Sequence, residues 1–306
     1  MKKCLFSPEC NGFYGAYYPL RRAPGKAMIL MLGDDASDRL ARSGVSWLQK
    51  QGLHVLAMAP AKKDYSHHNY PLERIAAAIR WLKICGHTHI GILGASTTGM
   101  LALVAAAHLP ALTLTIAISP SDFIMEGFYQ GKRDGYGEWP GDDESSVSWC
   151  GQPLPYLPYA YRHPAFAQCM QNEARYSGNL VASRCLFDES ERRHPLQESE
   201  RIKVEHIQGH VVCIGAEDDA MWDTCRYIRR MEESLAAHPH SCTFTALCYE
   251  YGTHFLFPQS MLKTMLPIGG SFLIGVVFRS GRRHPKACKA ARMDLDRRLR
   301  KILARW

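Results

Sequence analysis

Short apolar runs alternate with helical patterns along most of the chain. The runs short enough to be buried strands are 26–32, 53–58, 89–94, 112–118, 210–214 and 242–248. The segments between them carry apolar residues at helical spacing, which predicts helices over 37–51, 72–82 and 221–237 and a further helix that ends at about 108. Strands that alternate with helices in this way predict βαβ units, and therefore an α/β fold with a mostly parallel central sheet and helices on both faces.

The alternation breaks once, between residues 122 and 205. This stretch is rich in Gly, Pro, Tyr and Trp and ends in a polar helical segment, after which the pattern resumes at residue 210. The sequence therefore predicts one domain over 1–306 with an inserted cap or lid over 122–205, rather than two independent domains. Insertions above the carboxyl edge of a parallel sheet are where binding surfaces are built.

The strand at 89–94 leads directly into Gly94-Ala-Ser-Thr-Thr-Gly99 and then into a helix. A serine at the apex of a sharp strand-to-helix turn is typical of a nucleophile elbow, in which small residues let the backbone bend and expose the hydroxyl. The spacing here is G-x-S-x-x-G rather than the stricter G-x-S-x-G. An alternative is that Ser96 only caps the helix that follows.

A serine hydroxyl becomes a good nucleophile only when a base takes its proton and an acid orients the base. On this fold the acid should follow a later strand and the histidine the next one. Glu217, Asp218 and Asp219 follow the strand at 210–214, and His254 follows the strand at 242–248. We predict Ser96, Asp219 and His254 as the catalytic residues, with the other two carboxylates facing solvent.

Two further sets of site residues follow from the same topology. The backbone N–H groups of Thr97 and Asp34 are expected to form the oxyanion hole, because one donor follows the nucleophile and the other follows the first parallel strand. Phe123, Phe128 and Trp139 of the predicted cap are candidates for binding substrate. The alternative is that these aromatic residues form the cap's own small core.

Three motifs of the sequence carry a resemblance to a known family. They are the elbow at 94–99, the Asp-Asp-x-x-Trp segment within 215–222, and Gly252-Thr-His254. Over about residues 25–265 the chain resembles the C-terminal catalytic domain of the acyl-CoA thioester hydrolase / bile acid-CoA:amino acid N-acyltransferase family, within the α/β-hydrolases. The resemblance implies an α/β-hydrolase fold, an acyl ester or thioester as the small-molecule substrate, and a triad acid at the second Asp of the motif, which is Asp219.

The hypothesis is therefore a serine hydrolase that cleaves acyl thioesters or carboxylic esters through an acyl-enzyme. Some members of the family use Cys as the nucleophile, and Ser96 in that position favours transfer of the acyl group to water. Two alternatives stay open, namely an acyltransferase with an amine acceptor and a non-catalytic binding protein on a hydrolase fold.

The net charge of +8 is concentrated at the C-terminus. Residues 279–306 hold 11 Lys and Arg against two Asp, whereas residues 1–278 hold 26 basic and 27 acidic residues. Ala291, Leu295, Leu299, Ile302 and Trp306 follow helical spacing, so 285–306 is predicted as a basic amphipathic helix. It either docks on the sheet with a solvated charged face or attracts anionic partners such as CoA phosphates or acidic lipid; no motif indicates nucleic acid.

The remaining composition restricts the compartment and the cofactors. Eleven cysteines without a C-x-x-C pair, and no apolar signal region after Met1, predict a reduced cytoplasmic protein. The apolar run at 265–278 is too short to span a bilayer, so no transmembrane segment is expected. His206 and His210 lie four residues apart, but a strand begins between them, and we expect neither a metal nor a cofactor. Homo-oligomerisation is left open.

Overall fold

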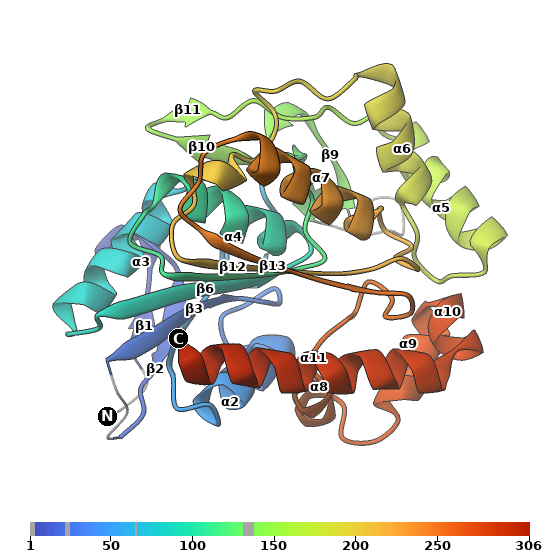
Figure 1. Ribbon diagram of the computed structural model, residues 1–306. Helices are drawn as coiled ribbons and strands as arrows, with labels where there is room; N and C mark the ends of the chain where they lie inside the picture. Colours follow the sequence, from blue (N-terminus) through green and yellow to red (C-terminus); the bar gives the residue numbers. More distant parts are fainter. Residues whose placement is uncertain (1–3, 22–24, 65, 131–137) are drawn as a thin grey trace.

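The computed structural model describes residues 4–21, 25–64, 66–130 and 138–306, and it is built around one eight-stranded sheet (Figure 1). The strand order is β1-β2-β4-β3-β6-β7-β12-β13. Strands β4, β3, β6, β7, β12 and β13 run parallel, and β2 joins β4 in antiparallel pairing. The strands are β1 Cys4–Phe6, β2 Gly15–Tyr18, β3 Lys26–Met31, β4 His54–Met58, β6 His89–Ala95, β7 Leu114–Ile118, β12 His210–Ala216 and β13 Thr243–Tyr249.

The six parallel strands are those that the apolar runs predict, to within two residues at every end. The antiparallel edge of β1 and β2 was not predicted. These strands are three and four residues long, and their pairing is specified by contact with β4 rather than by a local apolar pattern. The α/β fold class predicted from the sequence is confirmed.

Helices cover both faces of the sheet (Figure 1). One face carries α3 Glu73–Ile84, α4 Thr97–His108 and α7 Thr224–Ala237, and the other carries α2 Arg39–Gln49, α8 Gln259–Met265 and α11 Pro285–Arg305. Strand β3 contributes side chains to the apolar core on both faces of the sheet. Ile29 and Met31 pack with α4, while Met28 and Leu30 pack with α2. This two-sided burial explains why the strands read as continuous apolar runs.

Residues 122–205 hold most of the remaining elements. They are β8 Glu126–Gln130, β9 Glu138–Ser145, β10 Val147–Trp149, β11 Gln152–Pro153, α5 Ala165–Ser177 and α6 Arg184–Arg193, and β10 also pairs with β5 Tyr70–Pro71. Buried carboxylates join this stretch to α7 and hold its own segments together. Asp122 is 3% exposed and pairs with Arg230 of α7 and with Arg201, and the buried Glu126 accepts a hydrogen bond from the backbone N–H of Tyr159 at 2.7 Å.

The C-terminal stretch forms a helical layer under the sheet. It continues from α8 through α9 Gly270–Val277 and α10 Arg279–Arg283 to the long helix α11. In α11 the buried residues include Leu295, Leu299 and Leu303, and the Asp296 carboxylate accepts a hydrogen bond from the Trp47 indole of α2 at 3.1 Å. In the part of the chain described, no single helix is long and apolar enough to cross a membrane; α8 and α9 pass that test only as a pair, bent by 92°.

Candidate active site

In the turn between β6 and α4, a strained backbone conformation exposes the Ser96 side chain. Ser96 has φ +61° and ψ −129°, a conformation that non-glycine residues rarely adopt. Its N–H is held by the carbonyl of Ile118 at 2.8 Å. A Cβ on Gly94 would lie 2.0 Å from the carbonyl oxygen of Thr98, and one on Gly99 would lie 2.8 Å from that of Ile118. The turn therefore closes only with glycine at both positions.

Ser96, His254 and Asp219 form one chain of hydrogen bonds. His254 Nε2 lies 3.0 Å from Ser96 Oγ, and His254 Nδ1 lies 2.9 Å from Asp219 Oδ2. His254 is 6% exposed and Asp219 only 1%. Ser96 makes no side-chain capping bond to α4, so its hydroxyl faces the imidazole and does not cap the helix. The structure thus brings together the three residues that the sequence singled out.

The Asp219 carboxylate is held in place by its own loop and by α7. Its Oδ2 accepts a hydrogen bond from Thr224 Oγ1 at 2.6 Å, and its Oδ1 accepts one from the backbone N–H of Met221 at 2.8 Å. Thr224 is the first residue of α7, so the helix start positions the carboxylate. These donors compensate for the burial of an acidic group and fix its orientation toward the imidazole.

Asp218 differs from the prediction, which placed it facing solvent. Its Oδ1 accepts hydrogen bonds from the backbone N–H groups of Gly252 at 2.9 Å and Thr253 at 2.8 Å, and its Oδ2 accepts one from Ser280. The prediction for Asp218 was wrong, because loops distant in sequence surround this carboxylate. Glu217 is exposed and pairs with Arg229 at 2.8 Å, in agreement with the prediction for that residue.

An aromatic wall supports the imidazole of His254. The Trp222 ring meets it edge-on, with centroids 4.7 Å apart, and Phe187 of α6 packs on Trp222 at 5.1 Å. Ser119, at the end of β7, accepts the Trp222 indole N–H at its carbonyl (3.1 Å) and donates its hydroxyl to the carbonyl of His254 (3.2 Å). Trp222 is the last residue of the Asp-Asp-x-x-Trp segment. The structure gives that tryptophan a role as packing for the histidine.

Thr98 joins the serine turn to the end of strand β3. Its Oγ1 accepts the backbone N–H of Ala95 at 2.9 Å and donates to the carbonyl of Met31 at 2.7 Å. The sequence offered no signal for this bond because Met31 is 67 positions away. Thr98 therefore couples the serine turn to the neighbouring loop that follows β3.

The two expected oxyanion donors differ in their surroundings. Thr97 is the first residue of α4, where the N–H groups have no acceptor within the helix. The N–H of Asp34 instead donates to the Asp38 carboxylate at 2.7 Å, and Asp38 also caps α2 through the N–H of Ala41. Asp34 would have to leave this acceptor in order to reach a substrate oxygen.

The three aromatic candidates for substrate binding are buried to different degrees. Phe123 is fully buried and packs on Tyr227 of α7 with centroids 5.1 Å apart. Phe128 is 4% exposed, and Trp139 is half-buried and stacks on Tyr129. Their burial leaves neither Phe123 nor Phe128 open to a substrate, and both pack against residues outside 122–205, because Phe128 contacts His67.

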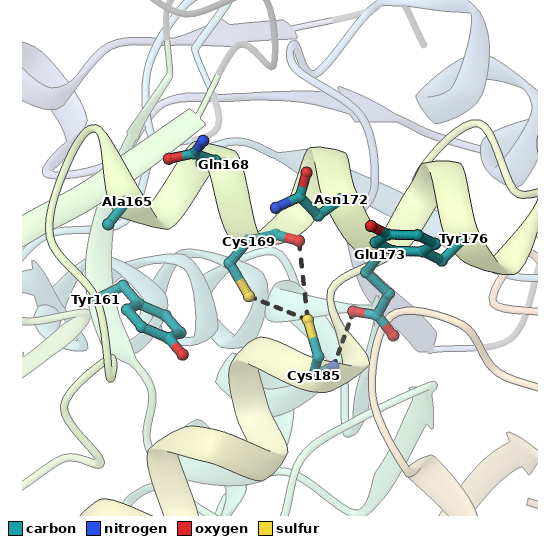
Figure 2. A pocket seen from close by; sticks show the side chains of 8 residues that line it. All are labelled: Tyr161, Ala165, Gln168, Cys169, Asn172, Glu173, Tyr176 and Cys185. Carbon is teal, nitrogen blue, oxygen red and sulfur yellow. Dashed lines mark hydrogen bonds between the residues drawn. The ribbon is translucent and has the colours of Figure 1, made fainter.

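A hollow at a different place lies between α5 and α6 (Figure 2). It has a volume of about 510 Å³ and is lined by Tyr161, Ala165, Gln168, Cys169, Asn172, Glu173, Tyr176 and Cys185. The thiols of Cys169 and Cys185 approach to 3.0 Å, and burial raises the pKa of both. Neither Ser96 nor His254 lines this hollow, so it is separate from the Ser96–His254–Asp219 contacts.

The described residues hold no group of three His, Cys, Asp or Glu side chains arranged for a metal ion. His206 lies in a short 3-10 helix, Val204–His206, and His210 begins β12. The ring of His210 faces Thr245, with Nε2 2.9 Å from the hydroxyl oxygen. The two histidines therefore lie on different elements, a short helix and a strand.

The fold is similar to that of a solved α/β-hydrolase structure. MGS-M1, an α/β-hydrolase enzyme from a Medee basin deep-sea metagenome library, is 14% identical with a TM-score of 0.54, over 100% of this chain and 99% of that one. Est1E from Butyrivibrio proteoclasticus (13% identity, TM-score 0.42, 88% and 96% covered) and the Pyrococcus furiosus esterase Pf2001 (13%, 0.46, 89% and 94%) are also similar. At 14% identity MGS-M1 bears on the fold alone.

The sequence from β5 to α8 matches the model of a known protein family. Residues 71–261 match the model of the BAAT / acyl-CoA thioester hydrolase C-terminal family, which is more than half of the chain. The chain belongs to this family and is a hydrolase of the esterase and thioesterase class, acting on ester bonds of a small-molecule substrate. No curated protein sequence matches the chain significantly.

Proposed function

We propose that the chain cleaves an acyl ester or thioester through a Ser96–His254–Asp219 triad and an acyl-enzyme. The observation that carries the proposal is the unbroken series of contacts from Ser96 Oγ to His254 Nε2 (3.0 Å) and from His254 Nδ1 to Asp219 (2.9 Å). In this arrangement His254 takes the hydroxyl proton as Ser96 attacks the acyl carbonyl. Asp219 keeps the proton on Nδ1, so that Nε2 is free to accept.

The second half of the reaction uses the same groups in reverse. The protonated His254 gives its proton to the departing alcohol or thiol, which leaves the acyl group on Ser96. A water molecule then attacks the acyl-serine, with His254 taking one of its protons, and the carboxylic acid is released. The buried position of Asp219 favours this cycle because a fixed carboxylate stabilises the imidazolium at each step.

The negative charge on the substrate oxygen requires backbone donors. Thr97 N–H is proposed as the first, because it starts α4 immediately after Ser96. Asp34 is proposed as the second, recruited when substrate displaces its N–H from Asp38. Each donor of this type lowers the barrier by about 3 kcal/mol in enzymes where it has been removed.

Residues 122–205 are proposed to act as the cap of this site, because Phe187 of α6 reaches Trp222 and, through it, His254. We also propose a cytoplasmic location, which rests on the composition of the chain. Among the described residues the eleven cysteines form no disulfide, as expected for a reducing compartment.

A fluorophosphonate probe tests the proposed nucleophile. It should label the wild type once per chain, and Ser96→Ala should lose both labelling and turnover of p-nitrophenyl esters. Ser177→Ala, at the end of α5, is the matched control and should be labelled like the wild type. Labelling of the Ser96→Ala variant would refute the assignment, and failure of the wild type to react would favour a non-catalytic binding protein.

A second assay separates hydrolysis from acyl transfer. Acyl-CoA and p-nitrophenyl esters of matched acyl length are incubated with and without an amino acid acceptor. We expect free acid in both cases, since Ser96 suits transfer to water. An amide product that forms only with the acceptor would instead identify an acyltransferase.

A further inference from the structure

Exposed apolar side chains gather on one part of the surface. Of the ten large apolar side chains that are exposed in the described residues, seven lie in the stretches 176–180 and 255–276. Ile268 is 92% exposed and Phe272 is 74% exposed. We call these residues the apolar face: Tyr176, Leu180, Phe255, Ile268, Phe272, Leu273 and Val276. Single exposed apolar residues are ordinary, but a group of this kind indicates an interaction site.

The two stretches of the apolar face adjoin one another. The N–H of Leu180 donates to the carbonyl of Val277 at 2.7 Å, and the N–H of Arg279 donates to the side chain of Asn179 at 2.7 Å. Figure 1 shows α5, α9 and α10 at the same end of the molecule. The end of α5 and the helix α9 therefore share one surface.

This surface borders the proposed active site. Phe255 follows His254 directly, is 39% exposed, and packs edge-on against Phe278 with ring centroids 5.2 Å apart. Phe278 is the residue that follows α9. The apolar face therefore extends from the neighbour of the histidine to the tip of the turn between α8 and α9.

The chain segment that carries most of the apolar face holds only positively charged side chains among its ionisable carboxylate and basic groups. From residue 251 to residue 293 the chain has seven Lys and Arg and no Asp or Glu. Exposed residues among them are Lys263, Arg282, Arg283, Lys286 and Lys289. Within the described part of the chain none of these five is in an ion pair with a carboxylate, whereas on α6 Arg192 and Arg193 both pair with Glu189. The positive charge beside the apolar face is therefore not neutralised internally.

A small hollow beside the apolar face combines apolar lining residues with positive charge. The turn between α8 and α9 borders this hollow of about 250 Å³, which is lined by apolar residues such as Leu266 and Phe272 and by Lys263 and Lys289. Next to it the guanidinium of Arg292 is 1% exposed and donates to Ser271 and Gln259, which are neutral groups of the same lining. Positive charge beside apolar walls suits a ligand that has an anionic head and a hydrocarbon chain.

We propose that the apolar face docks on an anionic lipid surface. Its aromatic and aliphatic side chains enter the boundary between headgroups and acyl chains, and the five exposed basic residues contact the anionic headgroups. A second copy of the chain fits less well, because a symmetric contact would bring two unneutralised basic segments together. Docking would bring His254 close to a layer where amphiphilic acyl substrates collect, and this consequence rests on the proposed function.

Vesicle co-sedimentation of the full chain tests the docking. We expect binding to vesicles of phosphatidylcholine with phosphatidylglycerol, weak binding to phosphatidylcholine alone, and loss of binding in high salt. Phe272→Ser should weaken binding about tenfold because one buried aromatic side chain is lost. Lys263→Gln and Lys289→Gln should each weaken it about fivefold.

Matched controls come from the opposite end of the sheet. Ile84 is 82% exposed at the end of α3, next to the exposed Lys83, so Ile84→Ser and Lys83→Gln should leave vesicle binding unchanged. Ser96→Ala should also bind normally, which separates docking from the reaction. Absence of binding to the anionic vesicles would overturn the proposal, as would equal effects of Phe272→Ser and Ile84→Ser. A dimer in sedimentation velocity that Phe272→Ser dissociates, without vesicle binding, would assign the face to a second copy instead.

Discussion

The carboxylate of Asp218 accepts a hydrogen bond from the backbone N–H of Thr253 at 2.8 Å, one residue before the histidine of the site. Thr253 is fully buried and has φ +62°, an unfavourable conformation for a β-branched residue. Asp218 therefore holds the loop of His254 in a strained form, while its neighbour Asp219 holds the imidazole itself.

The first prediction concerns this bond. Asp218→Ala removes the acceptor for two backbone N–H groups, so we expect it to lower the free energy of unfolding by about 2 kcal/mol and kcat by about 10- to 100-fold. Asp218→Asn keeps an oxygen acceptor and should recover most of both. Denaturant unfolding and ester hydrolysis measure the two effects. Equal losses in the Asn and Ala variants would contradict the positioning role.

The second prediction concerns the serine turn. Gly94→Ala would place a Cβ 2.0 Å from the carbonyl oxygen of Thr98, a contact that only a shift of the backbone relieves. We expect a loss of about 3 kcal/mol in stability together with the loss of fluorophosphonate labelling. Gly86→Ala is the control, because that glycine has φ +87° with open space around it. It should cost only about 1–2 kcal/mol and leave labelling intact.

The third prediction concerns acid stability. His67 is fully buried, neither ring nitrogen has a hydrogen-bond partner within the described structure, and burial lowers its pKa from the ordinary 6.5 to about 4. Below pH 6.5 His67 is therefore protonated in the unfolded chain but stays neutral in the folded chain. The free energy of unfolding falls as the pH falls toward 4. The expected loss is about 3 kcal/mol over this window.

His67→Leu tests this expectation by removing the titrating group. Chemical unfolding at pH 7, 5.5 and 4 should show a shallower pH dependence for this variant than for the wild type. His240→Leu, at an exposed position, should keep the wild-type profile. Parallel profiles for the wild type and His67→Leu would contradict the prediction.

The fourth prediction concerns the docking of α11 under the sheet. The Asp296 carboxylate joins three helices, because it accepts hydrogen bonds from Trp47 of α2 (3.1 Å), from the N–H of Ser260 in α8 (2.8 Å) and from Arg300 in α11 (2.8 Å). Although burial raises it, the bonds from Arg300 and Ser260 leave the pKa of Asp296 below its ordinary value. Asp296→Ala should therefore lower the unfolding free energy by about 3 kcal/mol at pH 7.

The control for Asp296 is a carboxylate on the surface. Asp188 pairs with Arg226 at 2.9 Å but is 47% exposed, so Asp188→Ala should change stability by less than about 1 kcal/mol. Equal effects of the two substitutions in denaturant unfolding would show that the Asp296 contacts do not hold the helices together.

Much of the fold could be predicted because local patterns determine it. Each parallel strand is buried on both faces and so leaves an apolar run, and each covering helix leaves a helical spacing. The chain order of Ser96, Asp219 and His254 at the ends of three such strands then follows from topology. The antiparallel edge of β1 and β2 left no comparable pattern, since short edge strands take their structure from the strand beside them.

Other features were decided by contacts between segments distant in sequence. Asp218 and Asp219 are adjacent and chemically identical, yet one contacts Gly252, Thr253 and Ser280 and the other contacts the imidazole. Phe123 is an aromatic residue of the predicted cap, and its packing against Tyr227 of α7 places it in the core. By itself the sequence determined the order of strands and helices and the three residues at their ends. The tertiary structure decided which neighbouring groups surround each side chain, because hydrogen bonds and burial depend on distances in space that no local pattern encodes.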